Sequence, residues 1–432
     1  MQAKQSPSAP LEIELEIESL AYEGAAIARD GARVVFVEGA APGDRVRAVV
    51  TRERKRFAEA RVVSVLRPGA ARVSPPCPVA GRCGGCDWQH VDYAAQLAAK
   101  RTIVVDALER SAKVASPAVE PVVASPETYG YRNRIRLHWS DGRLAYYARG
   151  SHRPVAISDC PIAELRIRTV LSRATALLAS LETPIGDVEL AGRVDLPGVT
   201  LALRSSGRFA AADTPRLLRA LGEEGPDGIT GVAMSGPRWS RTWGDTRRRF
   251  VVSDPELVVE TVESGFGQVN TAANRRLVEV VLDIVAARGT ETVWDLYSGT
   301  GNLALVLARA VKEIVAVERD PAAVAAARTA ADRYGLANAR FTVDAVEHFL
   351  AEPRARPDVV VANPPRTGLE HCATRLAEIA APRVIYVSCN PPTLARDVTA
   401  FMERGYSIGH VRPVDLFPQT CRVETVCELV LT

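Results

Sequence analysis

The C-terminal part of the chain alternates between strand-like and helix-like segments, and this alternation limits its fold more than any other feature. Strand-like segments lie at 292–296, 313–318, 339–343, 359–362 and 383–388, and helical spacing is found at 271–288 and 321–334. Strands that alternate with helices in this way form a parallel sheet covered by helices on both faces. We therefore predict a doubly wound α/β domain over residues 263–432.

A glycine-rich loop follows the first strand of this domain, a position where such folds bind nucleotides. Gly299 and Gly301 permit a tight turn and a close approach of the backbone to a ligand. Glu318 ends the next strand, where a carboxylate can accept hydrogen bonds from ribose hydroxyls. Ala304 replaces the third glycine of a dinucleotide motif, so the support for a pyrophosphate is incomplete. The pattern favours S-adenosylmethionine, with a generic nucleotide as the alternative, and Asp344 is expected near the adenine.

Two further strand ends carry residues with chemical functions. Cys389 ends the apolar run 384–388, where ligands reach the sheet, so its thiol is expected to face a substrate. A buried structural cysteine is the alternative interpretation. Asn363 opens an Asn-Pro-Pro-Arg motif after another strand, and the same motif would also serve as a turn that ends the strand. We predict that its prolines form a rigid wall beside the reacting group.

Glu424 stands in the largely apolar strand-like run 423–431. An ionised carboxylate is costly to bury unless it has a role or a partner. Burial would raise its pKa and suit it to proton abstraction. Glu424 is therefore the candidate general base. An outward-facing position on a strand would give the same pattern.

The first part of the chain is organised differently. Residues 11–66 alternate apolar and polar positions in short runs separated by Gly, Pro and Asp, which is typical of a small β-barrel. Helical spacing follows at 92–114, and a strand-rich region extends from 129 to about 249. We predict three domains, over residues 8–68, 74–262 and 263–432.

Four cysteines have the spacing of metal ligands. They are Cys77, Cys83 and Cys86 in a Pro-rich segment and Cys160 far downstream. Four cysteines can hold zinc or an iron–sulfur cluster. Disulfides are not expected, because the sequence begins without an apolar signal segment and the protein is predicted to be cytoplasmic. No apolar run approaches the length that spans a bilayer.

The distribution of charge says more than its total, because the formal net charge is only +3. Basic residues cluster within 45–72, at alternate positions over 132–136, and at 247–249. A solvated surface would explain any single cluster. Three clusters outside the cofactor-binding part favour a polyanion such as RNA as the partner.

Together these motifs resemble the RNA 5-methyluridine methyltransferases, and specifically the iron–sulfur branch that acts on 23S ribosomal RNA. The resemblance extends over nearly the whole chain. Residues 11–66 resemble the TRAM barrel of that branch, and the four cysteines match its [4Fe–4S] ligand pattern. The remaining matches are Phe266-x-Gln268-x-Asn270 to its F-x-Q-x-N motif, Ser388-Cys389-Asn390-Pro391 to its nucleophile motif, and Glu424 to its general base.

The resemblance implies a Rossmann-like class I methyltransferase domain, preceded by a TRAM barrel and a central α+β domain that binds the cluster. It implies that Cys389 adds to C6 of a flipped uracil, that C5 takes the methyl group of S-adenosylmethionine, and that Glu424 removes the C5 proton. Phe266 would stack on the base and Gln268 would hydrogen-bond its edge. The residues expected to line the pocket are Gln268, Tyr297, Asn302, Glu318, Asp344 and Asn363.

Two residues depart from the family pattern. Asn363 stands where the family usually has Asp, so a carboxylate contact becomes a neutral amide, and Arg422 stands where His is frequent. Asn-Pro-Pro also occurs in amino-group methyltransferases, but these do not need a cysteine at a strand end. A transfer-RNA methyltransferase of the same chemistry remains an alternative. A non-catalytic ribosome-assembly factor is another, although the presence of both Cys389 and Glu424 argues against it. We expect a monomer.

Overall fold

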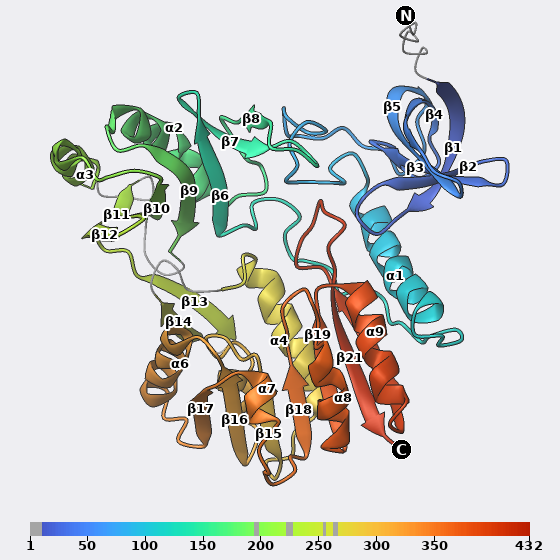
Figure 1. The fold of residues 1–432 in the computed structure, drawn as a ribbon, viewed down its shortest axis with the longest axis vertical. Helices are drawn as coiled ribbons and strands as arrows, with labels where there is room; N and C mark the ends of the chain where they lie inside the picture. Colours follow the sequence, from blue (N-terminus) through green and yellow to red (C-terminus); the bar gives the residue numbers. More distant parts are fainter. Residues whose placement is uncertain (1–10, 194–197, 222–227, 254–255, 262–266) are drawn as a thin grey trace, which may run out of the picture.

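The computed structural model describes residues 11–193, 198–221, 228–253, 256–261 and 267–432. The predicted domain limits at 8, 262 and 263, and Phe266, lie outside these residues. The described strands form a closed barrel, a seven-stranded central sheet, a two-stranded hairpin and a seven-stranded C-terminal sheet. Figure 1 shows the barrel and the central sheet side by side above the C-terminal sheet.

The N-terminal strands close into the predicted barrel, in the order β1-β2-β3-β5-β4. Its strands are β1 (Glu12–Leu20), β2 (Ala26–Asp30), β3 (Arg33–Glu38), β4 (Arg45–Glu53) and β5 (Phe57–Arg67). Alternate residues point inwards, as Leu15 and Ile17 do on β1 and Val35 and Val37 on β3, and all four are buried. The period of two seen in the sequence therefore corresponds to the inner and outer faces of the barrel.

Helix α1 (Tyr93–Arg110) joins the barrel to the C-terminal domain. It begins at Asp92, whose carboxylate accepts hydrogen bonds from two backbone amides of the first turn. Ile103 packs into the core of the barrel, whereas Val104 and Leu108 pack into the core beside the C-terminal sheet. One helix thus contributes to two hydrophobic cores, so the barrel cannot shift without disturbing the C-terminal domain.

The central sheet has the strand order β12-β11-β10-β9-β6-β7-β8. Its strands are β6 (Arg134–Ser140), β7 (Arg143–Tyr147), β8 (Pro154–Ala156), β9 (Ile185–Gly192), β10 (Val199–Ser205), β11 (Ile229–Gly236) and β12 (Trp239–Gly244). Helix α2 (Leu165–Ser180) packs against β9 and β10, and a 3-10 turn (Ala211–Asp213) leads into α3 (Thr214–Ala220). The strand-rich character was predicted, but these helices were not.

The C-terminal sheet has the order β17-β16-β15-β18-β19-β21-β20. Its strands are β15 (Thr292–Leu296), β16 (Glu313–Glu318), β17 (Ala339–Val343), β18 (Val359–Ala362), β19 (Arg383–Ser388), β20 (Tyr406–Val414) and β21 (Glu424–Leu431). The first five are parallel, as predicted. The prediction of a parallel sheet is wrong at one edge, where β21 runs antiparallel to both β19 and β20. A loop without a crossover helix joins β20 to β21, which permits only an antiparallel pair.

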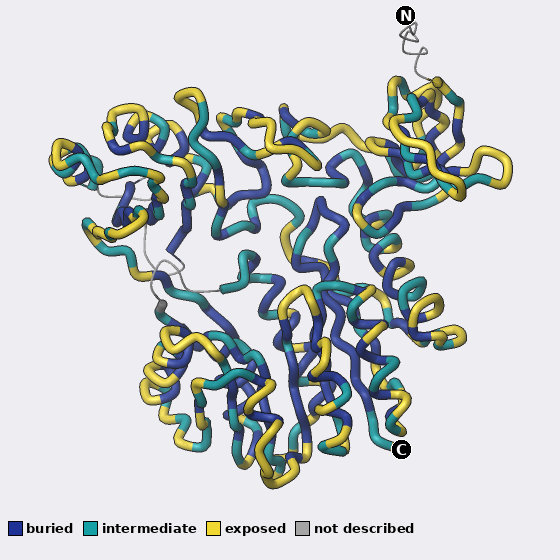
Figure 2. The backbone as a smooth tube through the Cα atoms, viewed as in Figure 1, coloured by how far each residue is buried: buried dark blue, intermediate teal, exposed yellow. Residues whose placement is uncertain are grey.

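Helices cover both faces of this sheet, as the predicted doubly wound fold requires. One face carries α4 (Thr271–Val285), α5 (Ala304–Leu307) and α6 (Pro321–Arg333), and the other carries α7 (Val346–Phe349), α8 (His371–Glu378) and α9 (Pro391–Met402). The hairpin β13 (Arg248–Ser253) and β14 (Leu257–Thr261) packs against α4 and α6. Figure 2 shows the sheet strands buried between helices whose outer sides are exposed. Among the described residues, no helix combines the length and apolar character needed to cross a membrane.

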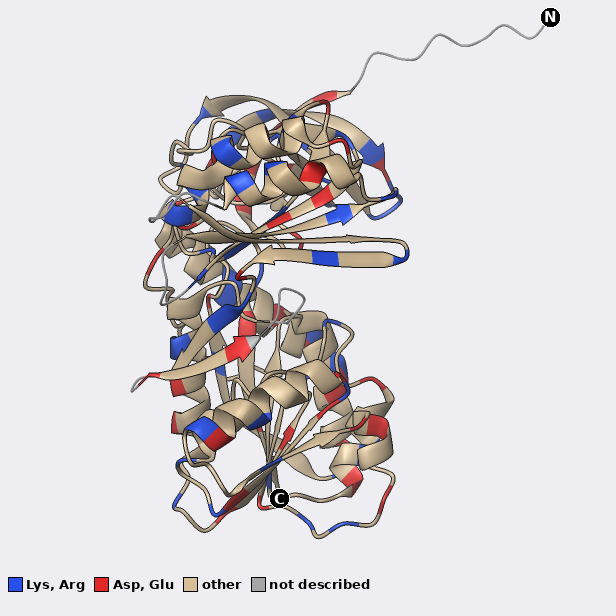
Figure 3. Ribbon diagram, turned by 90° about the vertical axis from the view of Figure 1, so that its left-hand side faces the viewer, with Lys and Arg blue, Asp and Glu red and all other residues tan. Residues whose placement is uncertain are grey.

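The predicted basic clusters differ in how far their charges are neutralised. At 247–249 each arginine has an acidic partner, and Arg248 is buried against Glu189 at 2.6 Å. The charges of this cluster are therefore neutralised by acidic partners, although Arg247 itself is exposed. Figure 3 shows acidic segments beside basic ones in both the upper and the lower part of the view. In the barrel, by contrast, four exposed basic residues have no ion pair within the described part of the chain: Arg54, Lys55, Arg56 and Arg61.

Candidate active site

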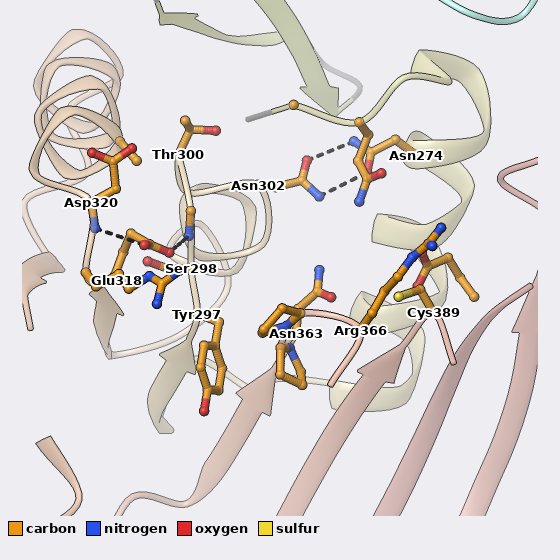
Figure 4. Close-up of a pocket in the computed structure, with 18 of the residues that line it drawn as sticks. Asn274, Tyr297, Ser298, Thr300, Asn302, Glu318, Asp320, Asn363, Arg366 and Cys389 are labelled. Carbon is orange, nitrogen blue, oxygen red and sulfur yellow. Dashed lines mark hydrogen bonds between the residues drawn. The ribbon is translucent and has the colours of Figure 1, made fainter. Parts of the chain in front are cut away.

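A cavity of about 740 Å³ opens at the carboxyl ends of β15, β16, β18 and β19. Figure 4 shows side chains from these strand ends pointing toward one another across it. The structure brings together here most of the predicted pocket residues: Gln268, Tyr297, Asn302, Glu318, Asp344, Asn363, Cys389 and Glu424. Parallel strands end at one edge of a sheet, which is why residues far apart in the sequence meet there.

The loop after β15 has the unusual backbone that its glycines predicted. Gly299 and Gly301 have φ values of +55° and +86°. A Cβ at Gly301 would lie 2.9 Å from Cγ of Leu305, so this position has no room for a side chain. Tyr297 also has a positive φ of 61°, which is uncommon for a residue other than glycine. Such backbone is found where a tight loop must present its amides to a ligand.

Two carboxylates stand at neighbouring strand ends on the cofactor side of the cavity. Glu318 Oε2 accepts a hydrogen bond from the amide of Gly299 at 3.0 Å, and its Oε1 accepts one from the amide of Asp320 at 2.9 Å. Asp344 Oδ1 accepts one from the amide of Ala345 at 2.8 Å. Each oxygen keeps a lone pair, so both carboxylates are fixed in place and still able to accept from a ligand.

Two asparagines line the same cavity, one held through its side chain and the other through its backbone. The Asn302 side chain is paired with that of Asn274 on α4, through reciprocal amide hydrogen bonds of 2.8 and 3.0 Å (Figure 4). This pair ties the glycine loop to the helix, a structural role that the sequence did not predict. Asn363 is held by its backbone amide, which donates to the carbonyl of Leu296 at 3.2 Å. Its side chain lies at the cavity, between the cofactor loop and Cys389.

Cys389 and Glu424 lie together because of the register between β19 and β21. Ser388 pairs with Thr425, so the next residue of one strand meets the preceding residue of the other. Glu424 is only 5% exposed, and burial raises its pKa to about 7 against the opposing effect of Arg366. Burial and the charge of Glu424 also raise the pKa of the half-buried Cys389 thiol. A thiol and a carboxyl group with a near-neutral pKa thus share one cavity, as a candidate nucleophile and base would.

Arg366 is a site residue to which the sequence analysis gave no role. It ends the Asn-Pro-Pro-Arg motif and lies beside Cys389 in Figure 4. Its positive charge lowers the pKa of both Cys389 and Glu424. The loop that carries it is anchored to α9, since Asp397 Oδ2 accepts from the amide of Leu369 at 2.7 Å. The sequence could have indicated a role for Arg366, because this cation follows the same strand as Asn363.

The loop that leads to Glu424 is held by residues of α1. Lys100 Nζ lies 2.6 Å from Asp415 Oδ1, and both side chains are fully buried. The side chain of Gln96 donates to Gln419 Oε1 at 3.0 Å and accepts from the Gln419 amide at 2.9 Å. The motif residue Asn270 adds a third anchor, because its Nδ2 donates to the carbonyl of Leu416 at 3.1 Å. Glu424 therefore stands at the end of a firmly fixed loop.

A second cavity, of about 40 Å³, lies in the central domain. The four predicted metal ligands all line it, together with Arg132 and Tyr146. Burial raises the pKa of Cys83 to about 11 and that of Cys86 to about 12. Within the described ranges, no three His, Cys, Asp or Glu residues are arranged so as to hold a metal ion. Four thiolates are a donor set that suits iron or zinc.

Two models of known protein families match separate parts of the chain. The family model described as tRNA (Uracil-5-)-methyltransferase matches residues 245–431, and the TRAM domain model matches residues 12–63. The second match falls on the barrel. The predictions of a methyltransferase domain and of a TRAM barrel are therefore confirmed.

Relatives match over almost the full chain. An uncharacterized RNA methyltransferase of Thermosynechococcus vestitus is 35% identical, over 96% of this chain and 97% of its own. A 23S rRNA (uracil(1939)-C(5))-methyltransferase of Chromohalobacter salexigens is 36% identical, over 97% of this chain and 89% of its own. The crystal structure of Pyrococcus abyssi tRNA (uracil-54, C5)-methyltransferase has the same fold, with a TM-score of 0.75 and 24% identity over 96% and 99% of the chains. The chain belongs to the RNA uracil-C5 methyltransferase family.

Proposed function

We propose that this enzyme transfers the methyl group of S-adenosylmethionine to C5 of a uridine in 23S ribosomal RNA. The observation that carries the proposal is the cavity that holds Cys389 and Glu424 together with the cofactor loop after β15. A thiol, a base and a nucleoside site within one cavity supply the parts that this reaction requires.

S-adenosylmethionine is the cofactor that the loop after β15 fits best. Fixed carboxylates at Glu318 and Asp344 suit hydroxyl and amino groups, which donate hydrogen bonds, better than they suit phosphates. The structurally similar Pyrococcus abyssi enzyme was crystallised with S-adenosyl-L-homocysteine. When bound, S-adenosylmethionine supplies an electrophilic methyl group on a sulfonium. Asn363 lies between this loop and Cys389, where it would contact the reacting part of the cofactor.

The reaction begins with addition, because C5 of uracil is a poor nucleophile. The Cys389 thiolate forms a bond to C6, and the C5=C6 electron pair moves to make C5 enolate-like. C5 then takes the methyl group, and the bond from methyl to sulfonium breaks with its electrons left on sulfur. Glu424 removes the C5 proton, the C5=C6 bond re-forms, and the thiolate of Cys389 leaves C6. The thiolate of Cys389 is regenerated, and Glu424 returns to its ionised state when it releases the proton to water.

The charges around the pair serve both steps. Arg366 favours the thiolate of Cys389 for addition and opposes part of the rise in the pKa of Glu424. A base with a pKa of about 7 can accept the C5 proton near neutral pH and release it to water afterwards. Arg422 likewise favours the thiolate, so the residue that replaces the usual His adds a permanent charge beside the nucleophile.

Ribosomal RNA is favoured over transfer RNA by sequence similarity. Relatives named as 23S rRNA methyltransferases, from Chromohalobacter salexigens and Halomonas elongata, are each 36% identical to this chain over nearly its full length. The named transfer-RNA enzyme is 24% identical. The exposed basic residues of the barrel, Arg54, Lys55, Arg56 and Arg61, suit the phosphates of either RNA.

We further propose that the four cysteines of the central domain hold a [4Fe–4S] cluster, with zinc as the alternative. Their common cavity supports this assignment, as does their place away from the reacting residues. Protein purified without oxygen should be brown and contain iron and acid-labile sulfide in equal amounts. Cys83→Ser should lose both. Colourless protein that contains zinc would refute the cluster.

Covalent trapping tests the proposed chemistry. RNA that contains 5-fluorouridine should form a denaturation-resistant adduct in the presence of S-adenosylmethionine, because Glu424 cannot remove fluorine from C5. Cys389→Ala should form none, whereas the buried Cys427→Ala should still form it. Absence of an adduct with wild-type enzyme on ribosomal and transfer RNA would favour a non-catalytic role. Mapping of 5-methyluridine in RNA from a deletion strain would then identify the target.

A further inference from the structure

The turn between β1 and β2 of the barrel reaches the loop that carries the nucleophile. The hydroxyl of Tyr22 donates a hydrogen bond of 2.9 Å to Oδ1 of Asn390, the residue that follows Cys389. On its other side, the Asn390 amide donates from Nδ2 to the carbonyl of Arg366 at 3.0 Å. The Arg366 carbonyl can only accept, so it fixes which way the Asn390 amide faces and leaves the amide oxygen to accept from Tyr22. Tyr22 therefore holds the residue that links the two loops.

The shape of this barrel turn is itself fixed. Glu23 and Gly24 have φ values of 74° and 94°. A Cβ on Gly24 would lie 2.9 Å from Cβ of Asp87, so the turn fits closely against that residue. The carbonyl of Gly24 accepts a hydrogen bond of 2.9 Å from the buried indole of Trp88. Tyr22 therefore extends from a rigid support.

The same support holds the loop that carries the base. The amides of Asp87 and Trp88 both donate to the carbonyl of Gln419, at 3.0 and 2.9 Å. The carboxylate of Asp87 accepts from the amide of Cys421 at 3.1 Å. Glu424 begins β21 just beyond this loop. Residues outside the C-terminal domain thus contact both loops from which the reacting pair extends.

We propose that Tyr22 is a positioning residue for methyl transfer, which makes the geometry of Cys389 and Arg366 depend on the docked barrel. This inference rests on the proposed function, since it concerns the same reacting thiol. The barrel would then have two roles. Its basic residues would bind the RNA phosphates, and Tyr22 would help to hold the residues that react with the base. Loss of the Tyr22 hydroxyl should slow the covalent step and leave the binding of both substrates intact.

The decisive variant is Tyr22→Phe, which removes one oxygen atom from a half-buried side chain. At saturating 5-fluorouridine RNA and S-adenosylmethionine, its adduct should form about tenfold more slowly than that of wild type. This factor corresponds to about 1.4 kcal/mol in the activation free energy. The KM for RNA and the affinity for S-adenosylmethionine should stay within about twofold of wild type. Tyr406→Phe is the matched control, because its hydroxyl donates to the carbonyl of Ala381 away from the cavity. Equal adduct rates in Tyr22→Phe and wild type would overturn the proposal.

A double variant tests whether Tyr22 acts through Asn390. Once Asn390→Ala has removed the acceptor, adding Tyr22→Phe should slow the adduct no further. Independent, multiplicative losses would mean that Tyr22 acts in some other way and would overturn the proposal as stated. Because the test compares variants in one background, a general loss of stability in Asn390→Ala does not change its outcome.

Alkylation of Cys389 provides a readout that needs no RNA substrate. The charged groups near the thiol are Glu424, Arg366 and Arg422. If Tyr22 keeps Arg366 in place, Tyr22→Phe should move the midpoint of Cys389 alkylation by iodoacetamide to higher pH, measured on the Cys389 peptide by mass spectrometry. Wild-type protein that forms no adduct would defeat the proposed function alone. Coincident alkylation profiles for wild type and Tyr22→Phe would defeat the positioning role.

Discussion

The buried carboxyl of Glu424 should make the protein less stable as the pH rises. In the unfolded chain this group loses its proton near its ordinary pKa of 4.5, whereas burial raises the pKa in the folded protein to about 7. Between these values the folded state binds more protons than the unfolded state, so the free energy of unfolding falls as the pH increases. The loss begins near pH 4.5 and is complete above pH 7. Glu424→Gln keeps the shape of the protonated acid and removes this dependence.

The size of the effect follows from the two pKa values. Each tenfold difference in acid dissociation corresponds to about 1.4 kcal/mol, so ionised Glu424 lowers the stability of the folded state by about 3 kcal/mol at pH 8.5. At pH 5 the same difference is about 1 kcal/mol. A catalytic domain of this size gains roughly 2–4 °C in melting temperature per kcal/mol. Glu424→Gln should therefore melt about 6–12 °C above wild type at pH 8.5.

Thermal unfolding of both proteins at pH 5 and pH 8.5 measures this difference. Glu403→Gln, which removes an exposed carboxylate just after α9, is the control for the loss of one negative charge. Glu424→Gln should also accumulate a methylated covalent adduct with ordinary uridine RNA, because the C5 proton has no acceptor. If Glu424→Gln is no more stable than wild type at either pH, Glu424 does not carry a buried charge and its assignment as the base loses its physical support.

Three further changes test the rest of the site. Arg366→Gln removes the cation that lowers the pKa of Glu424, so the acid limb of the pH–rate profile should move to higher pH, and an unchanged profile would contradict the electrostatic role. Glu318→Ala should weaken S-adenosylmethionine binding about tenfold or more in calorimetry, and wild-type affinity would place the ribose elsewhere. Asn363→Asp places a charge beside the expected sulfonium, so it should tighten binding of S-adenosylmethionine about fivefold relative to uncharged S-adenosylhomocysteine; an equal effect on both would disprove that contact.

Local sequence patterns predicted the C-terminal sheet well because its strands are buried on both faces. The interior of 313–318 and all of 359–362 are continuously apolar, and the structure gives both strands the predicted limits. Helix α2 was missed for a physical reason. Its first residues, Leu165 to Arg168, alternate apolar and polar positions, and β-branched Thr169 and Val170 follow, which favours a strand. The helical conformation is stabilised instead by the packing of Val170, Leu171 and Ala174 on the central sheet.

Some features of the site follow from local sequence, and others depend on contacts between distant residues. Cys389, Glu318 and Asn363 could be placed from sequence, because a residue that follows a strand in this fold lies at the cavity. The hydrogen bond from Tyr22 to Asn390 could not, since it joins positions 368 residues apart. The ion pairs of the arginines at 247–249 could not be predicted for the same reason, because a sequence does not show that Glu189 meets Arg248.

The contacts between α1 and the loop before β21 bear on how such enzymes can be recombined. Lys100 and Gln96 lie one turn apart on α1, and each is buried against a residue of that loop. Replacing one member of a buried ion pair leaves an uncompensated charge and costs about 3–5 kcal/mol. A chimera that takes its barrel and α1 from one relative and its C-terminal domain from another should therefore fold only when Asp415 and Gln419 are inherited together with their partners. Segments more than three hundred residues apart must therefore be exchanged together.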